Sequence, residues 1–229
     1  MDFAAARRNM IDCQVLPNRV TDERVIAAMA ETPREAFVPE TKRSIAYVDE
    51  ALAVGGGRYL MEPMITARLL QTARIGADDV VLCIGCGTGY SPALLSKLAN
   101  TVVVVESDKA MAKQAQETLA GLGIDTVAVI DGKMANGYPK QAPYDVIFFD
   151  GAVPSVPEKI EKQLAEGGRL VAVCSKRGSA VGSAVLAARF GGHISHRDLF
   201  DAGTPDLPGF ELEEAFTFSH RRIRCGLAP

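Results

Sequence analysis

Residues 81–90 read Val-Leu-Cys-Ile-Gly-Cys-Gly-Thr-Gly-Tyr, an apolar run that passes into a turn with glycine at every second position. Such a turn between a buried strand and a helix lies at the carboxyl edge of a parallel sheet, where glycines let the backbone approach a ligand closely. The spacing is not the Gly-x-Gly-x-x-Gly of dinucleotide folds, and no Gly-Lys-Ser or Gly-Lys-Thr follows. The stretch therefore predicts a nucleotide-like ligand held by neither of the two common phosphate-binding loops.

The chain around this turn alternates between apolar strands and helices. Strands are predicted at residues 79–84, 101–106, 126–130, 144–150 and 169–175. The intervening helices are predicted at residues 91–99 with Ser91 as cap, at 108–119 with Asp108 as cap, and after a capping box at 155–158. Strands this apolar are buried on both faces, so the fold class is α/β with a doubly wound, mostly parallel, Rossmann-like sheet.

The flanking segments differ from this core. Residues 1–37 show a helical pattern, in which Thr21 or Asp22 can cap the helix that contains Val25, Ile26 and Met29. Pro39, the glycines at 55–57 and Pro63 predict a long, partly extended loop, and a helix returns at 64–72. After residue 179, two segments predict an antiparallel hairpin at the sheet edge; they are residues 181–190 and 193–200.

Length and composition indicate one globular domain. The chain has 229 residues, of which 48% are hydrophobic and 23% charged. We expect N-terminal helices and a substrate loop at residues 1–75, a cofactor-binding core at 76–178, and an edge hairpin and tail at 179–229. The net charge of −3 excludes the strong positive field typical of nucleic-acid binding. The N-terminus does not read as a secretory signal and no apolar run is long enough to span a membrane, so a cytoplasmic protein is expected.

The cysteines and histidines predict neither disulfides nor a metal site. Five cysteines, an odd number spread over the chain, suggest free thiols, and Cys83 and Cys86 stand too far apart on a strand for a disulfide. The three histidines lack metal-ligand spacing. The basic segment at residues 220–224 is interpreted as a solvated terminus rather than an anion site.

Acidic residues follow the successive strands. Glu106 stands where a carboxylate accepts hydrogen bonds from ribose hydroxyls, and Asp131 with Gly132 is placed to hold an adenine edge. Asp150 completes a row of carboxylates that repels pyrophosphate but attracts a sulfonium and an ammonium group. The row favours S-adenosylmethionine, although the acids are also compatible with simple helix caps. The predicted donor site comprises Ile84, Gly85, Cys86, Gly87, Gly89, Tyr90, Glu106, Ser107, Asp131, Gly132 and Asp150.

Several segments resemble the protein-L-isoaspartate O-methyltransferase family. Residues 31–38, Glu-Thr-Pro-Arg-Glu-Ala-Phe-Val, are similar to an early segment of that family, and residues 81–90 are similar to its glycine loop. Residues 142–145 and 164–168 resemble the stretches that lead into its fourth and fifth strands. The resemblance implies a class I S-adenosylmethionine-dependent methyltransferase that esterifies isoaspartyl carboxylates in damaged proteins. A carboxylate is already ionised at neutral pH, so this transfer needs alignment more than a base.

The substrate loop departs from the family pattern. The family has Gln-Thr-Ile-Ser ahead of a proline, with the serine beside the substrate carboxylate, whereas Met61 stands at that position here. Arg58 and Tyr59 offer substitute hydrogen-bond donors, and Met61 is otherwise a packing residue. Cys83 replaces an acidic residue of the family's first strand. We expect Met61→Ser to raise isoaspartyl methylation.

The departures leave three functions open. The acceptor is an isoaspartyl protein or peptide, or it is a small molecule or another protein side chain, or the protein holds the cofactor without turnover. Neither nucleic acid nor membrane is an expected partner. No residue of the loop is assigned a catalytic role from the sequence.

Overall fold

The computed structural model describes residues 1–176, 178–179 and 181–211. The basic segment at 220–224 and Cys225 lie outside the described residues, so the expectations for them stay predictions.

A seven-stranded sheet in the order β5-β4-β3-β6-β7-β8-β9 forms the centre of the fold. Its strands are β3 (Val80–Ile84), β4 (Thr101–Glu106), β5 (Val127–Asp131), β6 (Tyr144–Val153), β7 (Leu164–Cys174), β8 (Gly182–Phe190) and β9 (His193–Ala202). The strands from β5 to β7 pair in parallel, whereas β8 and β9 are antiparallel. The predicted α/β class, the mostly parallel sheet and the edge hairpin are therefore confirmed.

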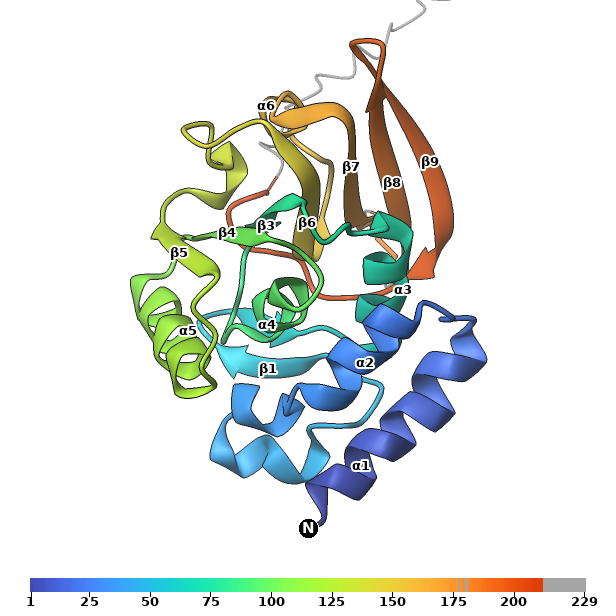
Figure 1. Ribbon diagram of the computed structural model, residues 1–229, viewed down its shortest axis with the longest axis vertical. Helices are drawn as coiled ribbons and strands as arrows, with labels where there is room; N and C mark the ends of the chain where they lie inside the picture. The colour runs from blue at the N-terminus through green and yellow to red at the C-terminus, as the bar shows by residue number, and fades with distance from the viewer. Residues whose placement is uncertain (177, 180, 212–229) are drawn as a thin grey trace, which may run out of the picture.

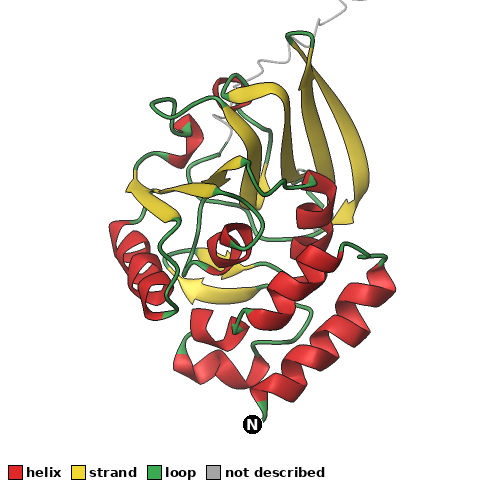
Figure 2. Ribbon diagram, in the orientation of Figure 1, coloured by secondary structure: helices red, strands yellow, loops and turns green. Residues whose placement is uncertain are grey.

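Apolar side chains on alternate strand positions form two cores, one on each face of the sheet. The larger core packs against α1 (Phe3–Met10), α2 (Glu23–Glu31), α3 (Pro63–Ala73), α4 (Tyr90–Ser96) and α5 (Lys109–Gly121). The other face carries less helix, namely η5 (Met134–Asn136) and α6 (Glu158–Glu161), together with residues 203–211. Figure 2 shows this uneven distribution of helices around the strands.

The N-terminal segment folds as a helical cap. After α1 the chain continues through a π-helical turn η1 (Ile11–Val15) and a 3-10 turn η2 (Leu16–Asn18) before α2. The Asp22 carboxylate accepts the backbone N–H groups of Arg24 and Val25, so Asp22 is the cap of α2. Figure 1 shows this cap at one end of the molecule, with the turn between β8 and β9 at the opposite end. No helix in the described part of the chain is both long and apolar enough to cross a membrane.

The segment predicted as a long loop is more ordered than expected. The 3-10 helix η3 (Arg34–Phe37) precedes it, and the segment itself contains the 3-10 helix η4 (Glu40–Ile45) and an antiparallel hairpin of β1 (Leu52–Gly55) and β2 (Arg58–Leu60). The three glycines at 55–57 all have positive φ angles, which closes the turn between these strands. The glycines at 55–57, which predicted a continuous loop, form the turn of a hairpin.

Two predicted helix caps are wrong. Gly89, not Ser91, is the N-cap of α4, and the Ser91 hydroxyl donates instead to Asp150 Oδ1 at 2.5 Å. The helix after residue 157 is only the short α6, and no side chain caps it. Leu164 already pairs with Tyr144 of β6. Residues that the local pattern assigned to a helix are therefore part of strand β7, because their pairing in the sheet outweighs helix propensity.

Candidate active site

The glycine turn lies at the carboxyl end of β3 and is buried. Gly85, Gly87 and Gly89 have φ angles of 78°, 48° and 103°, a region that residues with a side chain rarely adopt. Gly85 N donates to Val105 O of β4 at 2.9 Å, and Gly89 N donates to Cys86 O at 2.7 Å. The turn is thus held against the end of β4, beside the next predicted site residue.

Glu106 is the centre of a buried hydrogen-bond network at the end of β4. Its carboxylate accepts backbone N–H groups from Cys86 at 3.2 Å, from Ser107 at 2.7 Å and from Asp108 at 3.0 Å. Burial acts to raise the pKa of Glu106, but the hydrogen bonds from Arg58 and from these amides outweigh it and lower the pKa below its ordinary value. Glu106 is therefore a buried, ionised carboxylate.

Arg58 of β2 reaches this carboxylate from the hairpin. Its Nε lies 3.1 Å from Glu106 Oε2 and its Nη2 lies 2.5 Å from Oε1, a bidentate pair in which both side chains are almost completely buried. Nη2 also lies 3.1 Å from Ser107 Oγ. In this conformation Arg58 is engaged at the predicted donor site and is not available to an acceptor. No signal in the sequence indicated this pair.

Asp131 and Gly132 lie beside Glu106 at the same sheet edge. Glu106 and Asp131 are register partners of β4 and β5, and Gly132 N donates to Glu106 O at 3.0 Å. Asp131 is exposed and forms a surface ion pair with Lys109 at 3.3 Å. The fold therefore brings the predicted ribose and adenine residues together, with Asp131 accessible.

Asp150 lies in β6 directly after the last residue that pairs with β3, on the other side of the glycine turn from Glu106. Its side chain is buried, and burial raises its pKa to about 7, despite the hydrogen bond from Ser91. Glu106 contributes in the same direction, whereas Arg58 and Arg34 act to lower the pKa. Asp150 therefore takes up a proton near neutral pH, unlike Glu106.

This raised pKa predicts a measurable pH dependence of stability. An unfolded aspartate titrates near pH 4, so the folded state binds the extra proton between about pH 4 and 7, and stability falls as pH rises through that window. Asp150→Asn, a neutral isostere, is expected to exceed wild type in unfolding free energy by up to about 4 kcal/mol at pH 8. The difference is expected to narrow towards pH 5.

Denaturant unfolding of both proteins at pH 5 and pH 8 measures this difference. The exposed residue Asp78 offers a matched control, since Asp78→Asn removes a carboxylate outside the core. If the two proteins differ in free energy of unfolding by the same amount at both pH values, the raised pKa of Asp150 is contradicted.

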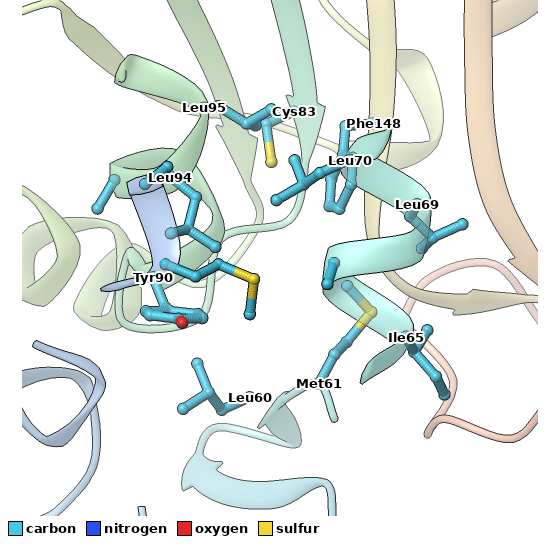
Figure 3. Close-up of a cluster of buried hydrophobic side chains, with 14 of the residues drawn as sticks. Leu60, Met61, Ile65, Leu69, Leu70, Cys83, Tyr90, Leu94, Leu95 and Phe148 are labelled. Carbon is cyan, nitrogen blue, oxygen red and sulfur yellow. The ribbon is translucent and has the colours of Figure 1, made fainter. Parts of the chain in front are cut away.

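The three substrate-loop candidates face different surroundings. Met61 is 2% exposed, and Figure 3 shows its side chain beside Ile65 and Leu69 of α3. In β2 the side chain of Tyr59 is 40% exposed, whereas the neighbouring Arg58 is buried and points to Glu106. Met61 therefore takes the packing role that the sequence had left open, and Tyr59 is the candidate that faces solvent.

Arg34, a residue that the sequence analysis did not assign to the site, is completely buried next to the glycine turn. It donates to Ala46 O and Met61 O, both at 2.7 Å, and its guanidinium lies 4.9 Å from the ring centre of Tyr90. Its Nη1 and the Tyr90 hydroxyl have no hydrogen-bond partner among the described residues. Arg34 thus holds the end of the hairpin against α4, and the Pro-Arg-Glu motif was the available signal.

The thiols near the turn are structural. Cys83 and Cys86 are buried and free, and burial raises the pKa of both. The Cys83 thiol donates to Gly85 O at 3.2 Å, within the first turn of the loop. Ile84 packs into the core on the other face of β3. These side chains shape the turn, and the expectation that Ile84 and Cys86 contact the donor stays a prediction.

The fold and this site define a class of protein. A mostly parallel sheet of seven strands, an alternate-glycine turn at its carboxyl edge, and a carboxylate ending the next strand are the features of Rossmann-like, S-adenosylmethionine-dependent methyltransferases.

Comparisons with known proteins identify the family within this class. A family model described as Protein-L-isoaspartate(D-aspartate) O-methyltransferase (PCMT) matches residues 6–187. The protein-L-isoaspartate O-methyltransferase of Roseiflexus sp. (strain RS-1) is 42% identical over 171 residues, which are 75% of this chain and 78% of that protein. The chain belongs to the protein-L-isoaspartate O-methyltransferase family, whose methyltransferases use S-adenosylmethionine.

Solved structures agree with this assignment. A structure named protein-L-isoaspartate O-methyltransferase has a TM-score of 0.77 and 27% identity, covering 89% of this chain and 67% of that one. A Plasmodium falciparum structure in complex with S-adenosyl-L-homocysteine has a TM-score of 0.76, covering 91% of this chain and 99% of that one. At 18% identity the second comparison shows a shared fold.

Proposed function

We propose that this chain transfers a methyl group from S-adenosylmethionine to the carboxylate of isoaspartyl residues in proteins or peptides. The observation that carries the proposal is the buried alternate-glycine turn that leads, through β4, to the ionised carboxylate of Glu106. Family membership supports both the donor and the acceptor.

The residues present match the donor in chemistry. The glycine turn offers a close backbone approach, Glu106 offers an acceptor for ribose hydroxyls, and Asp131 with Gly132 offers an edge for adenine. S-adenosylmethionine supplies an electrophilic methyl group on a sulfonium. Asp150 provides negative charge for the cationic end of the donor when it is ionised. In the structure the Glu106 carboxylate is paired with Arg58.

The acceptor side requires positioning rather than a base. A carboxylate is ionised at neutral pH, so the protein's contribution is to align it with the methyl group and to exclude water. Tyr59 is exposed on β2 and offers a phenol hydroxyl, and Arg58 offers a guanidinium once it leaves Glu106. Met61 offers no hydroxyl and points into the core, which favours a second candidate function, cofactor binding without isoaspartyl turnover.

Two measurements test the proposed function. Calorimetric titration is expected to show binding of S-adenosylmethionine or S-adenosylhomocysteine and no appreciable binding of NAD, because the acidic edge repels a pyrophosphate. Labelled donor is expected to be incorporated into an isoaspartyl peptide and not into the same peptide with a normal aspartyl linkage. Tight NAD binding without any response to the methyl donor would refute the methyltransferase assignment. Donor binding without turnover would favour the second candidate function.

A further inference from the structure

The β1–β2 hairpin covers the glycine turn directly. A β-carbon built on Gly87 would lie 3.5 Å from Val54 Cγ2 and 3.8 Å from Arg58 Cβ. A β-carbon built on Gly56, in the hairpin turn, would lie 2.9 Å from Asp108 Oδ2 at the start of α5. The hairpin therefore contacts both the glycine turn and the start of α5.

The Glu106 carboxylate has no acceptor position left for a ligand. Its two oxygens offer about four lone-pair sites. They receive six hydrogen bonds: three from the backbone amides of Cys86, Ser107 and Asp108, two from Arg58, and a long one from the Cys86 thiol at 3.9 Å. The amides belong to the turn and to the chain that follows β4, so they cannot leave without unfolding that edge. The Cys86 thiol belongs to the turn as well, so Arg58 is the one partner from outside this edge, and ribose hydroxyls reach Glu106 only if it moves away.

A second residue covers the first glycine of the turn. A β-carbon built on Gly85 would lie 3.0 Å from Leu207 Cδ2, and one built on Gly151 would lie 2.8 Å from Leu207 Cγ. The backbone of this segment is tied to β6, because Leu207 N donates to Ala152 O at 2.7 Å and Ala152 N donates to Pro205 O at 3.0 Å. The strands of the hairpin are anchored by buried side chains and by Lys42 Nζ, which donates to Ala53 O at 2.7 Å, whereas its turn at residues 55–57 is exposed glycine. The hairpin turn is therefore the solvent-exposed part of the two segments that lie over the glycine turn.

We propose that Arg58 closes the donor site in the resting protein, and that the donor binds only after the β1–β2 hairpin withdraws Arg58 from Glu106. This inference rests on the proposed function, because it concerns the same donor site. On binding, two hydrogen bonds from the ribose hydroxyls to Glu106 replace the two from the Arg58 guanidinium, so neutral groups take the place of a cation. The apparent affinity is lower than the intrinsic affinity by the fraction of molecules in the open state. Donor binding is thus coupled to hairpin opening.

Removing Arg58 is expected to tighten donor binding. Arg58→Met keeps the length of the side chain and removes the guanidinium, so S-adenosylhomocysteine is expected to bind at least about tenfold more tightly than to wild type. Arg58→Lys retains one charged hydrogen bond and is expected to give a smaller gain. It also serves as the second variant if Arg58→Met does not fold. The control is Arg169→Met, which removes an ion pair with Asp79 away from the site and is expected to leave the affinity unchanged.

An optical probe reports hairpin opening independently of activity. The chain contains no tryptophan, so Tyr59→Trp places a single fluorophore on the exposed side of β2. Saturating S-adenosylhomocysteine is expected to change its emission with the same midpoint as the calorimetric titration. In the Arg58→Met background, the emission without ligand is expected to lie closer to that of the ligand-bound state.

The outcomes separate this inference from the proposed function. The first outcome is that wild type binds the donor, that Arg58→Met leaves the affinity unchanged or weakens it, and that the Tyr59→Trp emission stays constant. This outcome overturns the proposed gate, the closure of the donor site by Arg58, and leaves the methyltransferase assignment intact. Binding to Arg58→Met but not to wild type supports the gate in its strongest form. Absence of donor binding in wild type and in both Arg58 variants refutes the donor site and the gate with it.

Discussion

Replacing Glu106 with alanine is expected to lower the free energy of unfolding by about 3–5 kcal/mol. The substitution leaves the buried guanidinium of Arg58 without its partner. The desolvation free energy of this buried charge is then no longer offset by an ion pair. Three backbone N–H groups lose their acceptor as well. Donor affinity is expected to fall by at least about tenfold, because each charged hydrogen bond contributes roughly 1.5–3 kcal/mol.

Guanidinium chloride unfolding and calorimetric titration measure the two effects. The double variant Glu106→Met with Arg58→Met is the informative control, since replacing both members of a buried ion pair with apolar residues is often nearly neutral. It is expected to recover much of the lost stability but none of the lost donor affinity. Asp79→Ala breaks a pair that is partly exposed, so its cost is expected to be smaller. A stability of Glu106→Ala close to that of wild type would contradict the buried network.

Met61→Ser is expected to destabilise the protein by about 3–5 kcal/mol and to lower its melting temperature by about 10 °C. Met61 is packed among the side chains of the larger core, so a serine leaves a cavity there. The new hydroxyl is also placed in apolar surroundings, which adds a penalty if it finds no partner. Met61→Leu, which conserves volume, is expected to cost less than about 1.5 kcal/mol. Thermal unfolding of the two variants side by side tests this difference.

The position of Met61 in the structure also changes the expected effect of Met61→Ser on isoaspartyl methylation. The resemblance to the family places Met61 where the family has a serine beside the substrate carboxylate, which predicted a gain of isoaspartyl methylation on Met61→Ser. In the structure this side chain lies beside Ile65 and Leu69 of α3, so we now expect no gain. Turnover of an isoaspartyl peptide by wild type and by Met61→Ser decides between the two. A rise in turnover at unchanged stability would place residue 61 at the acceptor site.

Much of the fold was readable from local patterns. The strand at Thr101–Glu106 and the cap at Asp108 were predicted at the residues where the structure has them. Apolar runs, helix caps and glycine turns are set by neighbouring residues, so they are visible in a short window of sequence. The order of the acidic residues along one sheet edge also followed, because parallel strands end at the same edge.

The predictions that failed involved competition between local and distant partners. Ser91 looked like a cap because it precedes a proline and an apolar run, but Asp150 lies within reach of its hydroxyl in the folded chain. The loop around Gly55 looked irregular because glycine and proline disfavour regular structure, but Leu52 and Leu60 pair across its turn. A cross-strand or side-chain partner that lies many residues away leaves no mark in the local pattern.

The sequence by itself determined the α/β class, the glycine turn and the presence of carboxylates at the strand ends, because each depends on residue type and short-range spacing. Only the tertiary structure decided that Arg58 pairs with Glu106, 48 residues away, and that Met61 faces the core. A strand fixes the alternation of its side chains but not which alternate set turns inward, and a hairpin as short as β1–β2 takes that choice from its contacts. For this reason the three residues expected to receive the acceptor separate in the structure: Arg58 pairs with Glu106, Met61 packs in the core, and Tyr59 faces solvent.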